Sequence, residues 1–293
     1  MQRLLKHVRE KQGLQVLLLI FPSAFWLIVF FLIPLLIVFA ISFARRGTYG
    51  GVVWELNIEN YLRFFDPLYL RIFARSFYIA LATTFFCFLL GYPLAFFIAR
   101  RPPRTRNTLL VLLMVPFWTN FLVRTYAWIL ILRNEGLINL ALQSLGIIHE
   151  PLPMLYTDGA IVVGLVYAWL PDMVLPCYAA VEHLDYSLVE AAQDLYANRV
   201  KAFVRVVLPL TAPGIVAGSI LVFIPSLGAY VTPDLLGGAK SMMIGNLIHQ
   251  QFLSVRHWPF GGAVSFVLMA FMLLGTVLYF RIAARSAAER GRR

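Results

Sequence analysis

Long apolar runs separated by short polar segments dominate the chain. Crossing about 30 Å of hydrocarbon takes roughly 20 residues in a helix, and six runs are long enough. They cover residues 14–42, 76–99, 108–132, 159–181, 212–235 and 262–283. The runs are too long, and alternate too little, for the strands of a membrane barrel, so only helices satisfy their backbone groups in lipid. The pattern predicts an all-α polytopic membrane protein, with six transmembrane helices in one domain over residues 1–293.

Composition agrees with a membrane protein. Of the 293 residues, 60% are hydrophobic and 13% are charged, against about 25% charged residues in an average soluble domain. The formal net charge of +11 does not indicate nucleic acid, because that function needs a basic face on a soluble fold. Most Lys and Arg residues lie instead in short loops or at the ends of apolar runs, so the charge indicates membrane topology. Membrane lipid is an expected partner of the chain.

The first run follows the basic segment MQRLLKHVREKQG, which resembles the start of a secretory signal. Its apolar part is too long for a signal, and no pair of small residues marks a cleavage site after it. We expect an uncleaved first span.

The distribution of Lys and Arg between loops predicts the orientation. With both termini in the cytoplasm, the inner side holds 16 of these residues and the outer side holds 7. Arg75 and Arg124 lie at or within spans and favour neither side. The segment 182–211 is then cytoplasmic.

Candidate chemistry for catalysis is sparse. Cys87 and Cys177 lie inside apolar runs, and the five histidines are scattered without metal-ligand spacing. We expect no metal, no cofactor and no catalytic residue.

The cytoplasmic segment 182–211 is helix-prone. Within it, LVEAAQDL places Glu190 and Asp194 four residues apart on one helical face, and Ala191 and Ala192 allow another surface to approach closely. The stretch VKAFVRVV has an apolar helical stripe with Lys201 and Arg205 on another face. We predict two short amphipathic helices joined near Asn198 and lying under the membrane.

Two prolines follow the second short helix. Because proline is tolerated in the first turn of a helix and breaks its interior, Pro209 and Pro213 are expected to end the short helix and to start the next span. Two interpretations of the helix pair are open. It either docks into a groove on a partner protein or packs only against its own bundle.

The segment EAAQDLYANRVKAFVRVVLPLTAPGI resembles the EAA loop of permease subunits of bacterial ABC importers. The matching positions are Glu190, Ala191, Ala192, Leu208, Pro209, Pro213 and Gly214, and the resemblance implies that this loop, with Asp194 and Tyr196, couples the permease to an ATPase. It also implies a type I ABC importer permease fold. Tyr196 stands where the family has Gly, and Tyr is strained at positive φ. Asn198, which tolerates a left-handed conformation, is expected to take over the turn.

Further stretches are similar to the spermidine/putrescine subfamily, from about residue 58 onward. They are VPFWTNFLVRTYAWIL, NEGLINLAL, LVYAWLPDMVLPCYAAVEHLD and PDLLGGAKSMMIGNLIHQQFLSVRHWPFG. Within that subfamily the chain resembles the first of two paired permeases. The resemblance implies polyamine import across the bacterial inner membrane, a heterodimer with a second permease subunit, two copies of a cytoplasmic ATPase, and an extracytoplasmic solute-binding protein.

The chain itself is not expected to hydrolyse ATP. LLGGAKSMM holds a glycine pair followed by Lys240 and Ser241, but it lacks the spacing of a phosphate loop and lies on the outer side. The alternatives are a permease for another small organic solute, an ion-driven secondary transporter, and an intramembrane enzyme. No inverted repeat supports the secondary transporter, and no catalytic constellation supports the enzyme.

Polar residues within spans are costly in lipid and usually face a cavity or a partner. The candidate substrate pathway therefore comprises Trp118, Asn120, Arg124, Tyr126, Tyr167, Trp169, Asp172, Ser226, Tyr230 and Asp234. Asp172, flanked by Trp169 and Tyr167, offers charge and aromatic faces to an ammonium group, or else it forms an ion pair with Arg124. Asp234 either contributes to an outer gate or caps a helix break. Glu135 and the loop 237–262 are expected to face the solute-binding protein.

Overall fold

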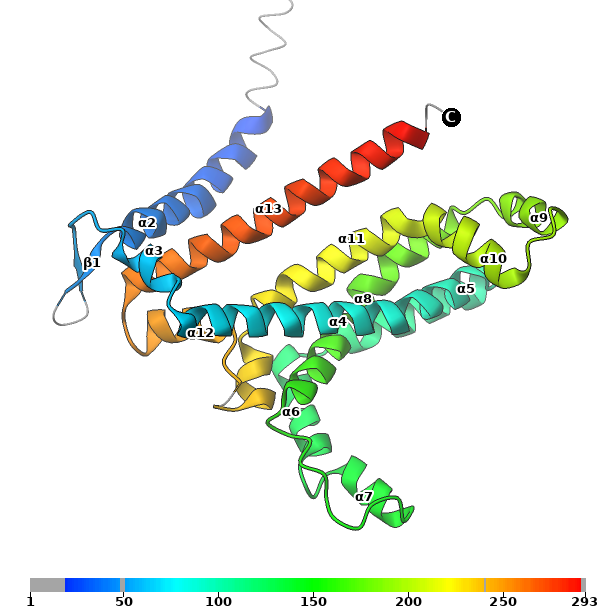
Figure 1. Cartoon of the computed structure of the whole chain (residues 1–293), viewed down its shortest axis with the longest axis horizontal. Helices are drawn as coiled ribbons and strands as arrows, with labels where there is room; N and C mark the ends of the chain where they lie inside the picture. The colour runs from blue at the N-terminus through cyan, green and yellow to red at the C-terminus, as the bar shows by residue number, and fades with distance from the viewer. Residues whose placement is uncertain (1–18, 48–50, 240, 291–293) are drawn as a thin grey trace, which may run out of the picture. The chain divides into compact units, whose positions relative to one another are not determined.

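The computed structural model describes residues 19–47, 51–239 and 241–290, and helices make up most of them (Figure 1). Residues 14–18 of the first predicted span lie outside the described residues. The elements are η1 (Ile28–Leu32), α2 (Ile33–Ser42), β1 (Arg45–Arg46), β2 (Val52–Val53), α3 (Glu59–Phe64), α4 (Pro67–Ala99), α5 (Pro103–Trp118), α6 (Phe121–Leu132), α7 (Leu137–Ser144), α8 (Asp158–Glu182), α9 (Ser187–Asp194), α10 (Arg199–Ala202), η2 (Phe203–Val207), α11 (Leu208–Leu227), η3 (Pro233–Gly237), α12 (Ile244–Leu253) and α13 (Trp258–Arg290).

The chain divides into two compact units, of which the first holds the residues up to Phe65 and residues 250–269. In this unit β1 and β2 form a short antiparallel hairpin with Arg45 opposite Val53. The buried Asn60 of α3 donates from Nδ2 to the carbonyl oxygens of Ser42 and Ala44, at 3.0 and 2.9 Å. These bonds satisfy the carbonyls left open at the end of α2, so the turn after the first span is fixed by one amide.

The second unit holds residues 66–249 and the rest of α13, and its core lies between α4, α8 and α11. Cys87 of α4, Met173 and Cys177 of α8, and Val222 of α11 are fully buried there. Small residues set the distance between α8 and α11. A Cβ on Gly214 would lie 2.5 Å from the carbonyl oxygen of Pro176, so the two backbones approach closely at this point.

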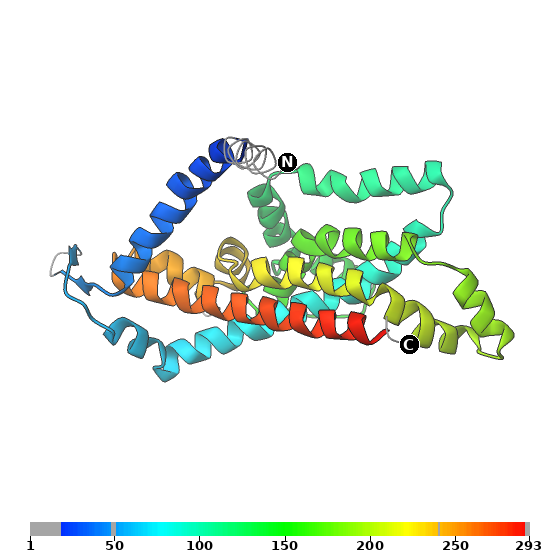
Figure 2. The same ribbon diagram turned by 90° about the horizontal axis from the view of Figure 1, so that it is seen from above.

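Five helices among the described residues are long and apolar enough to cross a membrane: Leu19–Ser42, Pro67–Ala99, Asp158–Glu182, Arg199–Leu227 and Trp258–Val277. The third predicted span, 108–132, is not one continuous helix. It is broken between α5 and α6, and the segments Pro103–Trp118 and Phe121–Ser144 are bent by 87° (Figure 2). Pro116 lacks an N–H for the helix ladder, and Asn120 starts the next helix by accepting hydrogen bonds from the amides of Leu122 and Val123.

The prediction that Pro209 and Pro213 separate a short helix from the fifth span is wrong. Helix runs without a break from Arg199 through η2 to Leu227 (Figure 1). The π turn η2 explains why the helix survives. A proline ring clashes with the carbonyl four residues earlier, and that carbonyl, on Arg205, lies in the widened turn, where the amide of Leu208 bonds to Phe203 instead.

The same solution recurs in the first span. Pro34 follows η1 at the same spacing, and the amide of Ile33 bonds to the carbonyl of Ile28. In both helices a π turn thus accommodates the proline that follows it.

The close approach of α8 and α11 makes a specific residue change costly. In Gly218→Ala the new Cβ would lie 2.9 Å from Sδ and 3.0 Å from the carbonyl oxygen of Met173, so we expect a loss of about 1–3 kcal/mol in unfolding free energy. Gly275→Ala is the control, because no atom lies within 4 Å of its added Cβ. Thermal unfolding of the purified variants in detergent measures the difference, and equal midpoints would contradict the close packing.

Candidate coupling element and substrate pathway

The turn between α9 and α10 is built on Tyr196. Its φ is +60°, its amide donates to the carbonyl of Gln193 at 3.0 Å, and the amide of Ala197 donates to the carbonyl of Ala192 at 3.1 Å. These two bonds are the Schellman pattern that ends a helix with one left-handed residue. Tyr196 therefore adopts the conformation that a glycine at this position supplies without strain.

The expectation that Asn198 takes over the left-handed turn is wrong. Asn198 is extended, with φ −68° and ψ 165°, and its Oδ1 accepts from the amide of Lys201 at 2.8 Å as the N-cap of α10. Asparagine serves better as a cap, because its side chain satisfies an amide that has no partner within the helix.

The start of α9 is fixed in a similar way. Oδ1 of Asp185 accepts from the amide of Ser187 at 3.0 Å. Hydrogen bonds from the Ser187 side chain and amide lower the pKa of Asp185 from its ordinary value, since they favour the charged carboxylate.

One side of this helix pair packs against its own bundle. Ala202 and Val207 are buried, and the ring of Phe203 contacts Tyr92 and Phe96 of α4 with centroid distances of 6.0 and 6.1 Å. Leu208 also packs against the core of the second unit. Pro209, Pro213 and Gly214 follow Leu208 within the continuous helix. Packing against its own bundle therefore describes only the side of the helix pair that carries Ala202, Phe203 and Val207.

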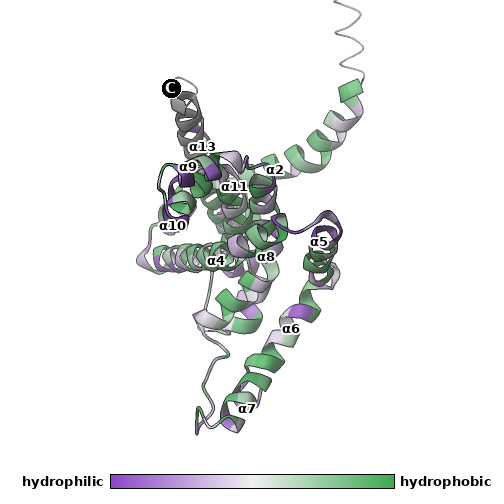
Figure 3. Cartoon of the chain, turned by 90° about the vertical axis from the view of Figure 1, so that its right-hand side faces the viewer, coloured by the Kyte–Doolittle hydropathy of each residue, from purple (hydrophilic) through white to green (hydrophobic). Residues whose placement is uncertain are grey.

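The other side of the helix pair is open in this chain. Glu190, Ala191 and Asp194 are exposed, and Ala192 is half-buried. The same segment exposes the apolar side chains of Leu188, Leu195, Tyr196, Val200 and Val204, and Tyr196 is 97% exposed. The colouring of Figure 3 shows hydrophilic residues on α9 and α10, whereas α4 is mostly hydrophobic. The open side thus combines two carboxylates with apolar side chains that the described residues of the second unit leave exposed.

Asp172 lies on α8, next to Met173 of the three-helix core. The residue is half-buried, and its Oδ2 has no hydrogen-bond partner within the described part of the chain. The indole N–H of Trp169 and the hydroxyl of Ser226 are likewise buried without a partner there. Three of the predicted pathway residues therefore carry unsatisfied polar atoms in the α4–α8–α11 core.

Tyr167 does not flank Asp172. Five residues along a helix turn the side chain by about 140°, so the two residues face different sides of α8. Tyr167 lines a cavity of about 560 Å³ between α4, α6 and α8, together with Trp128, Phe86 and Leu90. The predicted aromatic pair around Asp172 is thus reduced to Trp169.

No ion pair joins Arg124 to Asp172 among the residues that the structure describes. The Arg124 guanidinium carbon lies 5.8 Å from the ring centroids of Phe117 and Phe121 and 6.0 Å from that of Tyr167. The cation is thus held by aromatic faces, and Asp172 has no ion-pair partner among the described residues.

The remaining predicted pathway residues are dispersed. Trp118 is 74% exposed at the end of α5, Asn120 caps α6, and Tyr126 is exposed. Tyr230 stacks on His249 with a centroid distance of 4.8 Å. Asp234 is exposed in the first turn of η3, which has no side-chain cap.

The sequence patterns missed one polar cluster of the second unit. Nε of Arg75 in α4 lies 3.1 Å from Oδ1 of Asp158 in α8, and its Nη2 lies 2.9 Å from the hydroxyl of Ser241. The sequence contains a signal for this cluster, because Arg75 directly precedes one apolar run and Asp158 directly precedes another. Only the packing of α4 on α8 shows that they meet.

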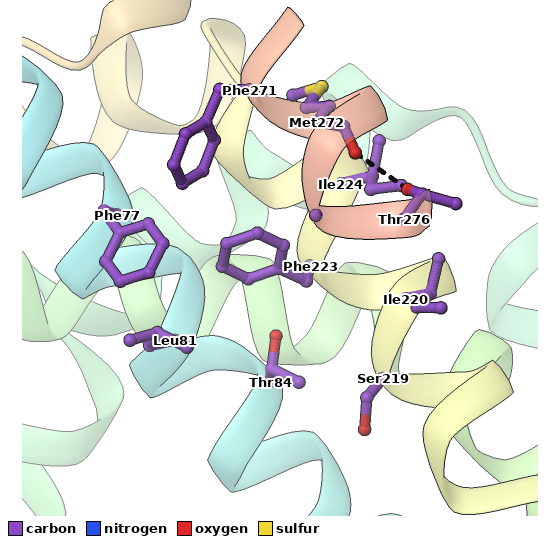
Figure 4. Close-up of a pocket in the computed structure, with 11 residues that line it drawn as sticks. Phe77, Leu81, Thr84, Ser219, Ile220, Phe223, Ile224, Phe271, Met272 and Thr276 are labelled. Carbon is purple, nitrogen blue, oxygen red and sulfur yellow. Dashed lines mark hydrogen bonds between the residues drawn. The ribbon is translucent and has the colours of Figure 1, made fainter. Parts of the chain in front are cut away.

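A second cavity lies between α4, α11 and α13, with a volume of about 380 Å³ (Figure 4). The rings of Phe77, Phe223 and Phe271 form one wall, and the hydroxyls of Thr84, Ser219 and Thr276 bond to carbonyls of their own helices. None of the predicted pathway residues lines it, and it offers no charge to a polar substrate.

Comparison with known proteins decides the family. A family model described as binding-protein-dependent transport system inner membrane component matches residues 91–288. The chain belongs to this family. The resemblance to ABC importer permeases and the expected all-α permease fold are therefore confirmed, apart from the two-residue strands β1 and β2.

Several relatives are similar over most of their length. The chain is 44% identical over 256 residues to the spermidine/putrescine transport system permease protein PotB of Escherichia coli (strain K12), covering 87% of this chain and 93% of that one. The PotB of Haemophilus influenzae is 45% identical, with 87% and 90% covered. The inner membrane ABC transporter permease protein YdcU of Escherichia coli is 34% identical, with 78% and 76% covered.

A solved structure supports the fold of the permease. A chain from a bacterial ABC transporter involved in the import of the acidic polysaccharide alginate matches with a TM-score of 0.71 at 17% identity, covering 96% of this permease and 99% of that chain. At this identity the match shows the fold alone.

The left-handed Tyr196 makes a stability change predictable. We expect Tyr196→Gly to stabilise the end of α9 by about 1 kcal/mol, because glycine has no Cβ to clash at positive φ. Amide hydrogen exchange of residues 191–197 measures the change as slower exchange. Ala197→Gly, one residue beyond the left-handed position, is the control and is expected to bring no such slowing; faster exchange in Tyr196→Gly would contradict the assigned turn.

Proposed function

We propose that the chain is one of two permease subunits of an ATP-driven importer and forms half of the translocation pathway for a polyamine. The observation that carries this proposal is the identity of 44% to a spermidine/putrescine permease over 87% of the chain. The exposed carboxylates and apolar side chains of α9 and α10 support it, because a permease without an ATPase of its own needs a docking surface for one.

The partners in this proposal are a second, paired permease, two copies of a cytoplasmic ATPase, and an extracytoplasmic solute-binding protein. Both termini lie in the cytoplasm, and α9 and α10 face the ATPase. The open side of α9 presents Glu190 and Asp194 four residues apart, and Leu195 and Tyr196 follow at its end. An apolar patch beside two carboxylates fits a groove on the ATPase that combines apolar and basic side chains.

The continuous helix from Arg199 to Leu227 transmits movement from the coupling element into the membrane span. A displacement of α10 is carried into α11 because η2 joins them without a loop. At Gly214 and Gly218, α11 lies too close to α8 for the two helices to slide independently. Movement at the ATPase surface is therefore transmitted to the helix that carries Asp172.

Asp172 is the proposed contact for an ammonium group of the substrate. Among the described residues its Oδ2 has no hydrogen-bond partner and its carboxyl group forms no ion pair with Arg124, and Trp169 lies one helical turn before it. A buried carboxylate without a partner is costly, and a cationic substrate offsets that cost.

The coupling role predicts the effect of a charge reversal. We expect Glu190→Lys to reduce ATP-driven uptake at least tenfold while the protein stays folded, because the new cation opposes a basic groove. Uptake into vesicles that contain the whole transporter measures this, and co-purification of the ATPase reports the docking. Glu150→Lys is the control, since Glu150 is an exposed acid outside segment 182–211; equal uptake in both variants would contradict the role.

The substrate role of Asp172 is tested separately. We expect Asp172→Asn to lower polyamine uptake at least tenfold, because the amide keeps the shape and removes the charge. The ATPase should still co-purify with the variant, which separates this defect from a loss of coupling. Thr83→Val is the control for a buried polar atom without charge outside the predicted pathway; unchanged uptake in Asp172→Asn would remove this residue from the pathway.

A further inference from the structure

The end of α4 nearest the coupling element forms a basic pocket. It has a volume of about 440 Å³ and is lined by Pro93, Phe96, Phe97, Arg100 and Arg101. The three apolar residues belong to the last two turns of α4, and the two arginines follow directly. The pocket thus lies where an apolar span meets a charged loop.

Aromatic rings hold both arginines in place. The guanidinium carbon of Arg100 lies 5.5 Å from the ring centroid of Phe96 and 5.8 Å from that of Tyr186, and that of Arg101 lies 4.1 Å from the centroid of Phe97. These contacts orient the side chains without neutralising them.

No carboxylate of the described residues forms an ion pair with Arg100 or Arg101. Arg106, in the first turns of α5, is paired with Glu182 at 2.6 Å. Arg106 is thus compensated, whereas the adjacent Arg100 and Arg101 of the pocket are available to an external anion.

An exposed apolar stripe leads along α4 to this pocket. Phe86, Leu90, Pro93 and Phe97 are exposed and recur at spacings of three or four residues, which places them on one helical face. From Leu90 to Arg101 the helix rises about 16 Å, at roughly 1.5 Å per residue. That rise is about half of the roughly 30 Å hydrocarbon core, which is the depth of one leaflet.

We propose that this end of α4 binds one anionic phospholipid of the leaflet on the side of the coupling element. The guanidinium groups of Arg100 and Arg101 bind the phosphate through charge-assisted hydrogen bonds, and an acyl chain lies along Phe97, Pro93 and Leu90. Because Arg100 also contacts Tyr186, one residue before α9, the bound lipid supports the position of the coupling element.

The stripe favours a lipid over the other ligands that the same arginines attract. Free phosphate uses the charge and leaves the apolar residues Phe97 and Leu90 uncovered. An acidic loop of a partner protein uses the arginines at the surface and does not reach Leu90, which lies about 16 Å along the helix from Arg101. A phospholipid uses both features at once.

Native mass spectrometry of the assembled transporter tests the proposal. The complex is released from nanodiscs that contain phosphatidylglycerol, or phosphatidylcholine alone, and the bound lipid is counted. We expect retained phosphatidylglycerol, and about fivefold weaker retention for each of Arg100→Gln and Arg101→Gln. Arg104→Gln and Arg281→Gln are the controls, because each removes one exposed arginine that does not line the pocket; they are expected to leave retention unchanged.

A second substitution tests the acyl-chain stripe without changing charge. We expect Leu90→Ser to weaken lipid retention while both arginines remain. Equal losses in the pocket variants and in the controls would overturn the proposal in favour of a general effect of surface charge. Displacement of the lipid by inorganic phosphate would assign the site to free phosphate, and retention that changes only when the ATPase is removed would assign it to a protein contact.

Discussion

The close contact between α8 and α11 is the constraint on which the rest of the second unit depends. Lipid gives no hydrophobic drive for helix association, so spans hold together through close van der Waals packing. Gly214 and Gly218 allow the backbone of α11 to lie against Pro176 and Met173 of α8, and Gly91 gives α4 the same access to Met173. The three helices therefore form one core, and the polar atoms of Asp172, Trp169 and Ser226 are enclosed in it.

The same contact connects the EAA-like segment mechanically to the core of the second unit. The residues that match the EAA pattern fall on two structures with different tasks. Glu190 and the alanines lie on α9, and Pro209, Pro213 and Gly214 lie within a continuous helix. The π turn η2 makes this continuity compatible with Pro209, because the displaced carbonyl lies in the widened turn. A surface that is open to a partner is thus joined by uninterrupted helix to the site where α11 meets α8.

Three ionisable side chains of the second unit have different surroundings. Arg75 is paired with Asp158 and Ser241, Arg124 is held by aromatic rings, and Asp172 has no partner within the described residues. An unpaired charge in a low-dielectric core costs free energy unless a ligand compensates it, so Asp172 is the strongest candidate for a functional contact. At the end of α4, Arg100 and Arg101 follow the second pattern, with rings that orient them and leave their charge available.

The sequence by itself determined the membrane class, the positions of most spans, the helical character of the segment around Glu190 and the family. These properties follow from local features: long apolar runs, the distribution of Lys and Arg, and a motif of contiguous residues. Only the tertiary structure decided that the span 108–132 bends, that Pro209 lies inside a helix, and that Tyr196 takes the left-handed turn. It also separated Tyr167 from Asp172 and brought Arg75 to Asp158. The physical reason is that proline, a buried charge and a strained φ each allow several local solutions, and the packing of α4, α8 and α11 selects among them.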